Sequence, residues 1–258
     1  MGIIAEIKEI VGEENVFDDR VECLCNSRDM SVHQGVADAI VFAKTTEQVS
    51  AIMKLAHRDK VPVTARGTGS SVTGAVLPVR GGIVLDLHNM KNVLEVNKAD
   101  FYARVEPGVV CMPLNAMLAK EGLMFPPNPG SEAIATIGGM VSTNASGHRA
   151  VKYGTTRDYI KGLKVVLADG TIMETGTTAP KTSLGYDLTH LFTAAEGTLG
   201  IVTEVIIKLE PKPEYDAMAL AIFGELSGAG DAVTEVITSG IKLAGCEIMD
   251  KYSLKVVE

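Results

Sequence analysis

Hydrophobic and polar positions follow two different periods in the first 65 residues. Apolar residues recur at helical spacing over residues 3–11, and Gly12 follows where a helix C-cap is expected. A second helical pattern covers residues 45–60 and begins with a Thr-Thr-Glu capping sequence. Short β-branched runs flank this helix at residues 39–43 and 61–65. Strand, helix and strand in this order predict a βαβ unit with a parallel pair of strands.

Beyond residue 82 the pattern favours β-structure. We expect one helix over residues 112–121 and strands over residues 83–87, 93–96, 102–106, 163–167, 171–174 and 201–209. The turn Ala168-Asp169-Gly170 predicts that the strands on either side of it form a hairpin.

A boundary is expected at Pro211-Lys212-Pro213. After it, the pattern predicts a strand over residues 217–223 and a helix over residues 231–239, with Asp231 as a possible N-cap. One strand and one helix cannot bury both faces of a sheet. We therefore expect one domain over residues 1–212 and the beginning of a second, incomplete domain over residues 213–258.

Composition places the chain among folded proteins. Its 258 residues are 46% hydrophobic and 22% charged, which excludes intrinsic disorder and coiled coils. A formal net charge of −8 makes nucleic acid and anionic membranes poor partners. The sequence shows no apolar run of about 18 residues and no secretory leader. We therefore expect a cytoplasmic protein without a transmembrane segment, and peripheral attachment to the inner face of the membrane stays open.

The four cysteines have irregular spacing, which is typical of a reduced protein rather than of a disulfide framework. Cys23-Leu24-Cys25 could bind a metal ion, but the sequence has no second Cys or His pair at the spacing of metal ligands. Two buried or edge thiols are the favoured interpretation, and we expect no metal site.

The most informative segment is a loop rich in Gly and Ser, residues 66–74, that directly follows the strand at 61–65. Clustered Gly and Ser allow successive backbone N–H groups to turn toward one point, and their hydroxyls add donors, which suits a pyrophosphate. The loop is neither a Walker A sequence nor a dinucleotide fingerprint, because no Gly-Lys-Ser/Thr follows and no G-x-G-x-x-G opens a helix. Taken alone, such a loop is as often an ordinary tight connection.

Two further segments of small residues follow, and together with the first they indicate a ligand site. Pro126–Ser131 leads into residues 136–147, and residues 195–202 precede the last strong strand. Three glycine-punctuated segments suggest that backbone approaches a large flat ligand from several sides.

The order of these segments and their amino-acid sequences resemble those of the flavoprotein superfamily of vanillyl-alcohol oxidase and p-cresol methylhydroxylase (PCMH). Within it, the chain is most similar to the D-subunit of glycolate oxidase and to FAD-linked D-lactate dehydrogenases, with alkylglycerone-phosphate synthase a more distant relative. The resemblance extends from about Phe17 to Pro213, and the matching segments are residues 46–49, 66–69, 82–86, 135–139, 152–158, 167–170 and 196–201. It implies an α+β protein with a PCMH-type FAD-binding fold of two α/β subdomains, followed by the start of an incomplete substrate (cap) domain.

The resemblance also implies residue roles around FAD. The pyrophosphate would be held by Arg66, Gly67, Thr68, Gly69, Ser70 and Ser71. The flavin and its ribityl chain would be lined by Gly130, Ser131, Thr136, Gly138, Gly139, Thr143, Asn144, Ala145 and Ser146. The adenine end would be held by Glu196, Gly197, Thr198, Leu199, Gly200, Ile201 and Val202.

Two positions depart from the family pattern. Some relatives attach FAD covalently through a His in the first loop, where this chain has Ser70, so we expect non-covalent FAD. Ser146 stands where these dehydrogenases more often carry Gly. Residues 153–158 would brace the pocket, although Arg157 and Asp158 could equally form an ordinary ion pair.

The activity that the resemblance implies is oxidation of a D-2-hydroxy acid such as glycolate or D-lactate, by hydride transfer from Cα to flavin N5. Such a reaction needs a base and cations for the carboxylate, and the sequence does not identify the catalytic residues. His148-Arg149, Lys181 and Tyr186-Asp187 are the candidates that could approach the pocket, although a structural role is commoner for such a histidine.

Electrons would leave to an iron–sulfur or other electron-transfer partner. The alternative is an FAD-binding fragment or subunit without its own catalysis, an electron carrier completed by a separate chain that carries the substrate domain.

Overall fold

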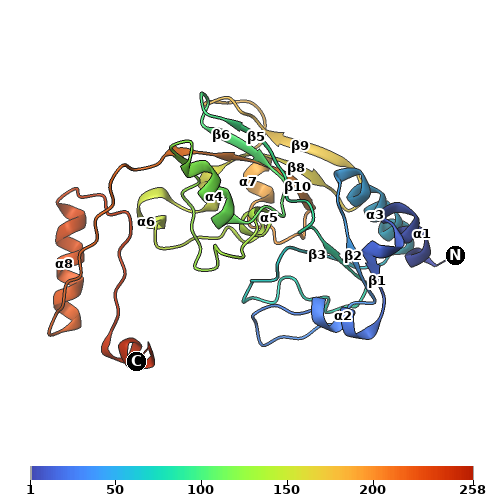
Figure 1. Cartoon of the computed structure of the whole chain (residues 1–258), viewed down its shortest axis with the longest axis horizontal. Helices are drawn as coiled ribbons and strands as arrows, with labels where there is room; N and C mark the ends of the chain where they lie inside the picture. Colours follow the sequence, from blue (N-terminus) through green and yellow to red (C-terminus); the bar gives the residue numbers. More distant parts are fainter. Residues whose placement is uncertain (1, 258) are drawn as a thin grey trace.

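The computed structural model describes residues 2–257 and divides most of them between two sheets, each with its own helices (Figure 1). The first sheet has the order β1-β2-β4-β3, formed by Val16–Phe17, Ala39–Phe42, Ile83–Asp86 and Val63–Arg66. The second sheet has the order β5-β6-β10-β8-β9, formed by Val93–Asn97, Tyr102–Val105, Ile201–Lys208, Ile160–Val166 and Ile172–Gly176. This mixed α and β architecture agrees with the expected fold class.

The helices of the first sheet form where the sequence supplies caps and an apolar stripe. Helix α1 (Ile3–Val11) buries Ile7 and Val11 and ends at Gly12, and it packs against α3 (Thr46–Asp59). The Thr45 hydroxyl caps α3 by accepting a hydrogen bond from the Gln48 backbone N–H at 3.2 Å. Both helices were therefore correctly predicted.

Two features of the first sheet differ from the sequence expectation. Strands β2 and β3 are parallel but do not pair with each other, because β4 lies between them and pairs with both. Helix α2 (Arg20–Asn26), which no pattern predicted, is capped by the Asp19 carboxylate and carries Cys23 buried and Cys25 exposed.

The second sheet is antiparallel, and helices cover one of its faces. Its core packs β6, β8 and β10 against three helices, α4 (Cys111–Ala119), α5 (Ile137–Thr143) and α7 (Leu188–Phe192). The predicted hairpin is present as β8 and β9, with Gly170 at φ +83° in its turn. The remaining elements of this region are β7 (Leu123–Met124), α6 (Ala150–Tyr153) and β11 (Glu210–Pro211), with short 3-10 turns at Glu13–Asn15 and Thr156–Tyr159.

The two subdomains are joined through buried contacts. Val166 of β8 and Ile201 of β10 belong to the hydrophobic cluster of the first sheet, and the buried Ser50 hydroxyl on α3 donates to the Gly170 carbonyl at 2.6 Å. This junction fixes the distance between the loops that leave the two sheets.

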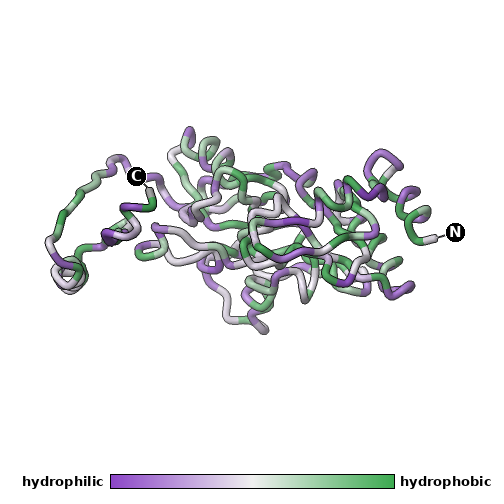
Figure 2. Tube along the Cα trace, turned by 90° about the horizontal axis from the view of Figure 1, so that it is seen from below, coloured by the Kyte–Doolittle hydropathy of each residue, from purple (hydrophilic) through white to green (hydrophobic). Residues whose placement is uncertain are grey.

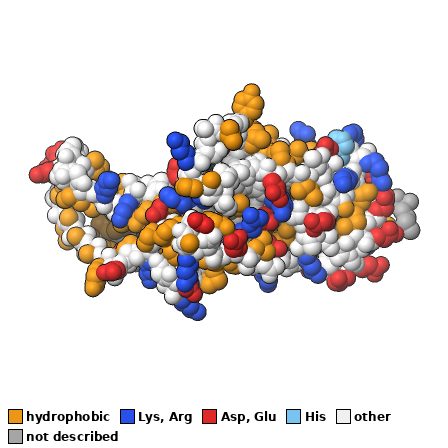
Figure 3. All heavy atoms as spheres, turned by 90° about the horizontal axis from the view of Figure 1, so that it is seen from above, with side chains coloured by type: hydrophobic (Ala, Val, Ile, Leu, Met, Phe, Trp, Pro, Cys, Tyr) orange, Lys and Arg blue, Asp and Glu red, His pale blue; other side chains and the backbone are white. Residues whose placement is uncertain are grey.

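A ladder of alternating charges crosses the outer face of the second sheet. Arg104 contacts Glu204 at 2.7 Å and Glu95 at 4.0 Å, and Lys164 contacts Glu204 at 3.1 Å and Glu174 at 3.4 Å. Figure 3, which views the molecule from this side, shows acidic and basic side chains interspersed over the sheet. Glu204 is central because its carboxylate separates the two cations.

Most of the C-terminal segment stands away from this body (Figures 1 and 2), but it returns to it at Gly245, whose Cβ position would lie 2.9 Å from the His148 ring. The strand predicted over residues 217–223 was wrong: this stretch pairs with nothing, and Met218 and Ile222 remain 98% and 90% exposed. The predicted helix forms, but as α8 (Leu226–Thr238) it begins five residues earlier than expected, so that Glu225 rather than Asp231 is the N-cap residue. A last helix, α9, covers Lys251–Val257. No helix within residues 2–257 combines the length and the apolar character needed to cross a bilayer.

We predict that Glu204→Gln lowers the free energy of unfolding by about 1–2 kcal/mol, because Arg104 and Lys164 then face each other without the carboxylate between them. Urea unfolding measures the change. The matched control is Glu174→Gln in the same ladder, which should cost less than about 0.5 kcal/mol, since the Glu174 side chain is 71% exposed whereas that of Glu204 is 12% exposed. Equal losses from both variants would contradict this assignment.

Candidate cofactor-binding site

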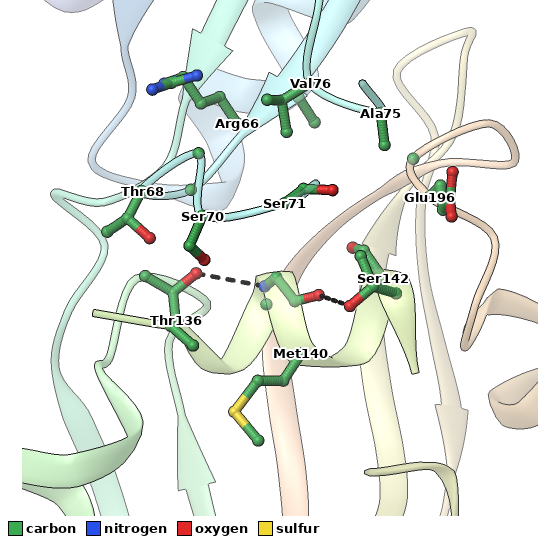
Figure 4. Close-up of a pocket in the computed structure, with 18 of the residues that line it drawn as sticks. Arg66, Thr68, Ser70, Ser71, Ala75, Val76, Thr136, Met140, Ser142 and Glu196 are labelled. Carbon is green, nitrogen blue, oxygen red and sulfur yellow. Dashed lines mark hydrogen bonds between the residues drawn. The ribbon is translucent and has the colours of Figure 1, made fainter. Parts of the chain in front are cut away.

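A cavity of about 480 Å³ lies between the loops of the two subdomains (Figure 4). Three segments line it: the first loop (residues 66–74), the second segment (residues 131–145) and the third loop (residues 195–202). The residues predicted from the sequence that line it are Arg66, Gly67, Thr68, Gly69, Ser70, Ser71, Ser131, Thr136, Gly138, Gly139, Thr143, Ala145, Glu196, Gly197, Gly200, Ile201 and Val202.

Five predicted residues lie near the cavity without lining it. Gly130 and Ser146 are exposed. Asn144 ends α5 in the left-handed conformation, and the Thr198 hydroxyl donates to the Ala195 carbonyl at 2.5 Å. Leu199 faces solvent. Sequence reasoning also missed lining residues that continue or face the motifs, namely Ala65, Val72, Thr73, Ala75, Val76, Leu87, Pro107, Ala135, Met140 and Ser142. Those at 72–76 could have been found as the apolar continuation of the first loop.

The first loop offers a run of unused backbone donors. Within the described part of the chain, none of the N–H groups of residues 67–72 donates a hydrogen bond to the protein. The Thr68 hydroxyl donates to the Ile134 carbonyl at 2.8 Å and thereby ties the loop to the second segment. The Ser71 and Thr73 hydroxyls pair with each other at 2.9 Å, whereas Ser70 has no protein partner among the described residues. Such a run of free N–H groups suits a phosphate-bearing ligand.

The amino end of α5 forms the opposite wall, and its own donors are already used. The Ile137 and Gly138 N–H groups donate to the carbonyls of Val109 and Pro107, both at 2.8 Å, and Gly139 donates to the capping Thr136 hydroxyl at 3.3 Å. Figure 4 shows this helix with Thr136, Met140 and Ser142 across from the first loop. The anion-binding capacity of the cavity therefore resides in the first loop rather than in the helix.

Glycines allow these walls to approach closely. A Cβ atom on Gly67 would lie 2.5 Å from the Thr136 hydroxyl oxygen, and one on Gly138 would lie 2.5 Å from Cβ of Pro107. Gly69 has φ +71°, and a side chain there would collide with the Arg66 guanidinium. These contacts explain why this stretch is built from glycine.

The third loop is docked onto the far end of α5. Ala194 and Glu196 donate from their backbone N–H groups to the carbonyls of Val141 at 2.9 Å and Ser142 at 3.0 Å. Ala194, Glu196 and Gly197 all have positive φ, at 67°, 50° and 77°. Non-glycine residues are uncommon in this conformation, so the loop is held in place by its surroundings.

Arg157 and Asp158 do not form an ion pair with each other in the described structure. The Arg157 backbone N–H donates to the Asn144 side-chain oxygen at 2.8 Å, and its guanidinium donates to the Thr193 carbonyl at 3.2 Å. The Asp158 carboxylate accepts from the Thr155 N–H at 2.7 Å. Arg157 thus links the end of α5 to the segment that precedes the third loop.

The proton-transfer candidates taken from the sequence do not line the cavity. The Nε2 atom of His148 lies 3.2 Å from the side-chain amide nitrogen of Asn128. The side chains of Lys181 and Tyr186 are exposed. The Asp187 carboxylate caps α7, and hydrogen bonds from His190 lower its pKa. Among the lining residues, the charged side chains are those of Arg66 and Glu196. The walls are suited to binding, and they carry few groups that could move protons.

Two subdomains that enclose a cavity lined by glycine-rich loops define a cofactor-binding domain of the PCMH type. A family model described as an FAD binding domain matches residues 37–176, and the chain belongs to this family.

Curated relatives are FAD-linked oxidoreductases. The chain is 39% identical over 254 residues to "Glycolate oxidase subunit GlcD" of Bacillus subtilis, covering 98% of this chain and 54% of that protein. It is 37% identical over 252 residues to "Probable D-lactate dehydrogenase, mitochondrial" of Danio rerio, covering 96% and 50%. The chain therefore spans about half the length of the curated relatives it matches.

Solved structures of the same type confirm the fold. An alkyldihydroxyacetonephosphate synthase matches with a TM-score of 0.82 at 25% identity, over 94% of this chain and 46% of that chain. p-Cresol methylhydroxylase matches with a TM-score of 0.72 at 26% identity, over 83% and 44%. The expected resemblance and the expected cofactor, FAD, are thereby confirmed.

We predict that Gly69→Ala weakens FAD binding at least about tenfold, because both the positive φ and the Arg66 guanidinium oppose a Cβ atom there and the first loop must shift. Fluorescence titration of the apoprotein with FAD measures the dissociation constant. Gly122→Ala is the matched control, since Gly122 also has φ +71° but no atom within 4 Å of its Cβ position. The Gly122→Ala variant should lose stability and keep the FAD affinity of the wild type. Wild-type affinity in Gly69→Ala would show that the loop conformation does not govern binding.

Proposed function

We propose that this chain is the FAD-binding part of a dehydrogenase or oxidase that acts on a D-2-hydroxy acid such as glycolate or D-lactate. The single observation that supports this most strongly is the run of unused backbone donors at residues 67–72, set in a cavity of an FAD-binding family. The choice of substrate rests on the names of the glycolate oxidase and D-lactate dehydrogenase relatives.

The residues present fit FAD. The N–H groups of residues 67–72 and the Ser70 hydroxyl would bind the pyrophosphate, which needs several convergent donors. The second segment (Ser131, Thr136, Gly138, Gly139) would lie along the flavin and its ribityl chain, and the third loop (Glu196–Val202) would hold the adenine end. None of the described lining residues is His, Cys or Tyr, and Ser70 stands where some relatives carry the linking His. We therefore propose that FAD is bound without a covalent bond.

In the proposed reaction, the cofactor and the protein would each supply different chemical groups. Bound FAD supplies an acceptor for the two electrons that leave the substrate Cα as hydride. The protein must bind the substrate carboxylate and take the hydroxyl proton. Arg66 and Glu196 are the charged side chains of the cavity, and Arg66 is already engaged by Asp86 and the Arg28 carbonyl. We propose that the base and the carboxylate-binding cations come from a substrate (cap) domain that begins with residues 213–258, whereas residues 1–212 form the FAD-binding domain.

A second candidate is an FAD-binding subunit without its own catalysis, completed by a separate chain. The one carboxylate among the described lining residues is that of Glu196, which is proposed to lie at the adenine end, and this favours the second candidate. In both cases an iron–sulfur or other electron-transfer partner would accept the electrons, which is in keeping with the relative named as a subunit of glycolate oxidase.

We predict that the purified protein binds FAD, shows absorbance bands near about 370 and 450 nm, and releases the flavin into the supernatant on acid precipitation. The measurement is the absorbance of the supernatant and the pellet. A yellow pellet would overturn non-covalent attachment. Colourless protein that takes up no added FAD would overturn both candidate functions.

We predict that D-lactate or glycolate bleaches the 450 nm band under anaerobic conditions if the complete substrate site is present, because the electrons then have no other acceptor (roughly two electrons per flavin). L-lactate is the stereochemical control and should bleach far more slowly. An FAD-loaded protein that no D-2-hydroxy acid bleaches contradicts catalysis by this chain alone and favours the non-catalytic subunit.

A further inference from the structure

We propose that the buried Asp86 carboxylate is a positioning residue for FAD: it holds Arg66 in place, and Arg66 supports the bend of the first loop. The inference rests on the proposed FAD-binding function and adds to it a residue that does not line the cavity.

Asp86 stands at the carboxyl end of β4, in register with Arg66 at the end of β3. Its Oδ1 accepts a hydrogen bond from the His88 backbone N–H at 2.8 Å and lies 2.6 Å from His88 Nδ1. Its Oδ2 lies 3.7 Å from Arg66 Nε. The Asp86 and Arg66 side chains are only 4% and 10% exposed. Asp86 therefore joins the ends of two neighbouring parallel strands at the point where the first loop begins.

The Arg66 guanidinium continues this linkage into the loop. Its Nη1 donates to the Arg28 carbonyl at 2.6 Å, and the guanidinium occupies the space directly beside Gly69. The chain bends at residues 67–68, and Gly69 directly after this bend has φ +71°, a conformation that glycine adopts without strain. If Arg66 moved, the loop would lose the surface on which this bend rests, and its free N–H groups would no longer be held toward one ligand.

Each of the two buried charges stabilises the other, together with groups around them. Burial raises the pKa of Asp86, an effect that His88 and Arg66 oppose, and burial lowers the pKa of Arg66, which Asp86 and Asp29 oppose. Removing one partner leaves the other buried with less compensation, so a loss of stability is expected from either single substitution.

A purely electrostatic role and a positioning role of Asp86 predict opposite changes in FAD affinity when its charge is removed. Asp86 is a negative charge close to the loop proposed to bind the pyrophosphate, so its removal would strengthen binding if only charge mattered. If Asp86 positions Arg66, its removal weakens binding. The sign of the change in affinity therefore distinguishes the two roles.

The experiment measures the dissociation constant for FAD in Asp86→Asn by fluorescence titration of the apoprotein, together with urea unfolding. We expect FAD to bind at least about tenfold more weakly. The double variant Asp86→Asn with Arg66→Gln removes both buried charges. It should regain stability relative to Asp86→Asn but keep the weakened FAD binding, because the guanidinium that supports Gly69 is gone.

Glu204→Gln is the matched control, since it breaks another partly buried carboxylate–arginine contact on the outer face of the second sheet. It should lose stability and retain wild-type FAD affinity. Unchanged or tighter binding in Asp86→Asn would overturn the proposal. If that variant does not fold, Arg66→Gln and the double variant decide: equal FAD affinity in these two variants supports the proposal, because Asp86 then acts only through Arg66, and tighter or weaker binding in the double variant overturns it. A wild-type protein that binds no FAD would instead contradict the proposed function itself.

Discussion

The first loop holds a run of backbone N–H groups at residues 67–72 that donate to no acceptor among the described residues, so these donors remain available to a ligand. In most connections these donors would be satisfied by a turn or a cap. Here the bend at Gly69 and the tether from Thr68 to the second segment leave them facing a cavity. The rest of the structure keeps that cavity open at a fixed width.

The width is set by the junction between the subdomains. One wall belongs to the first sheet, through β3 and the first loop, and the other to the second sheet, through α5 and β10. The bond from Ser50 to Gly170 and the packing of Val166 and Ile201 into the first sheet's cluster fix one wall relative to the other. Large side chains are excluded where the walls meet, as the positions of Gly67 and Gly138 show. A ligand held by backbone on several sides needs this rigidity, because misplaced main-chain donors cannot adjust as side chains do.

Local patterns in the sequence were sufficient for the parts of the fold that local chemistry determines. The caps at Gly12 and Thr45 and the hairpin turn at Gly170 follow from short-range signals, and so does the glycine-rich character of the cavity loops. The central place of β4 between β2 and β3 is a non-local pairing, which alternation of residue types does not encode. The stretch at residues 217–223 shows the converse, because a strand-like pattern forms no strand where no neighbour pairs with it. The link from Asp86 to Arg66 likewise joins residues that are distant in sequence.

Charged side chains lie mostly on the outer surface of the molecule, whereas the cavity walls carry mainly uncharged groups that bind. Acidic and basic side chains are concentrated on the outer surface, as in the ladder around Glu204, while the cavity is walled by backbone, small residues and hydroxyls. Such walls suit an anionic cofactor, since backbone donors bind phosphate without titrating near neutral pH. Glu196 carries the one carboxylate among the lining residues described, so the proposed oxidation would need further proton-transferring groups brought to the cavity. The relatives named as a glycolate oxidase subunit and as a D-lactate dehydrogenase are about twice as long as this chain, so in them the matching region is accompanied by a comparable length of further chain.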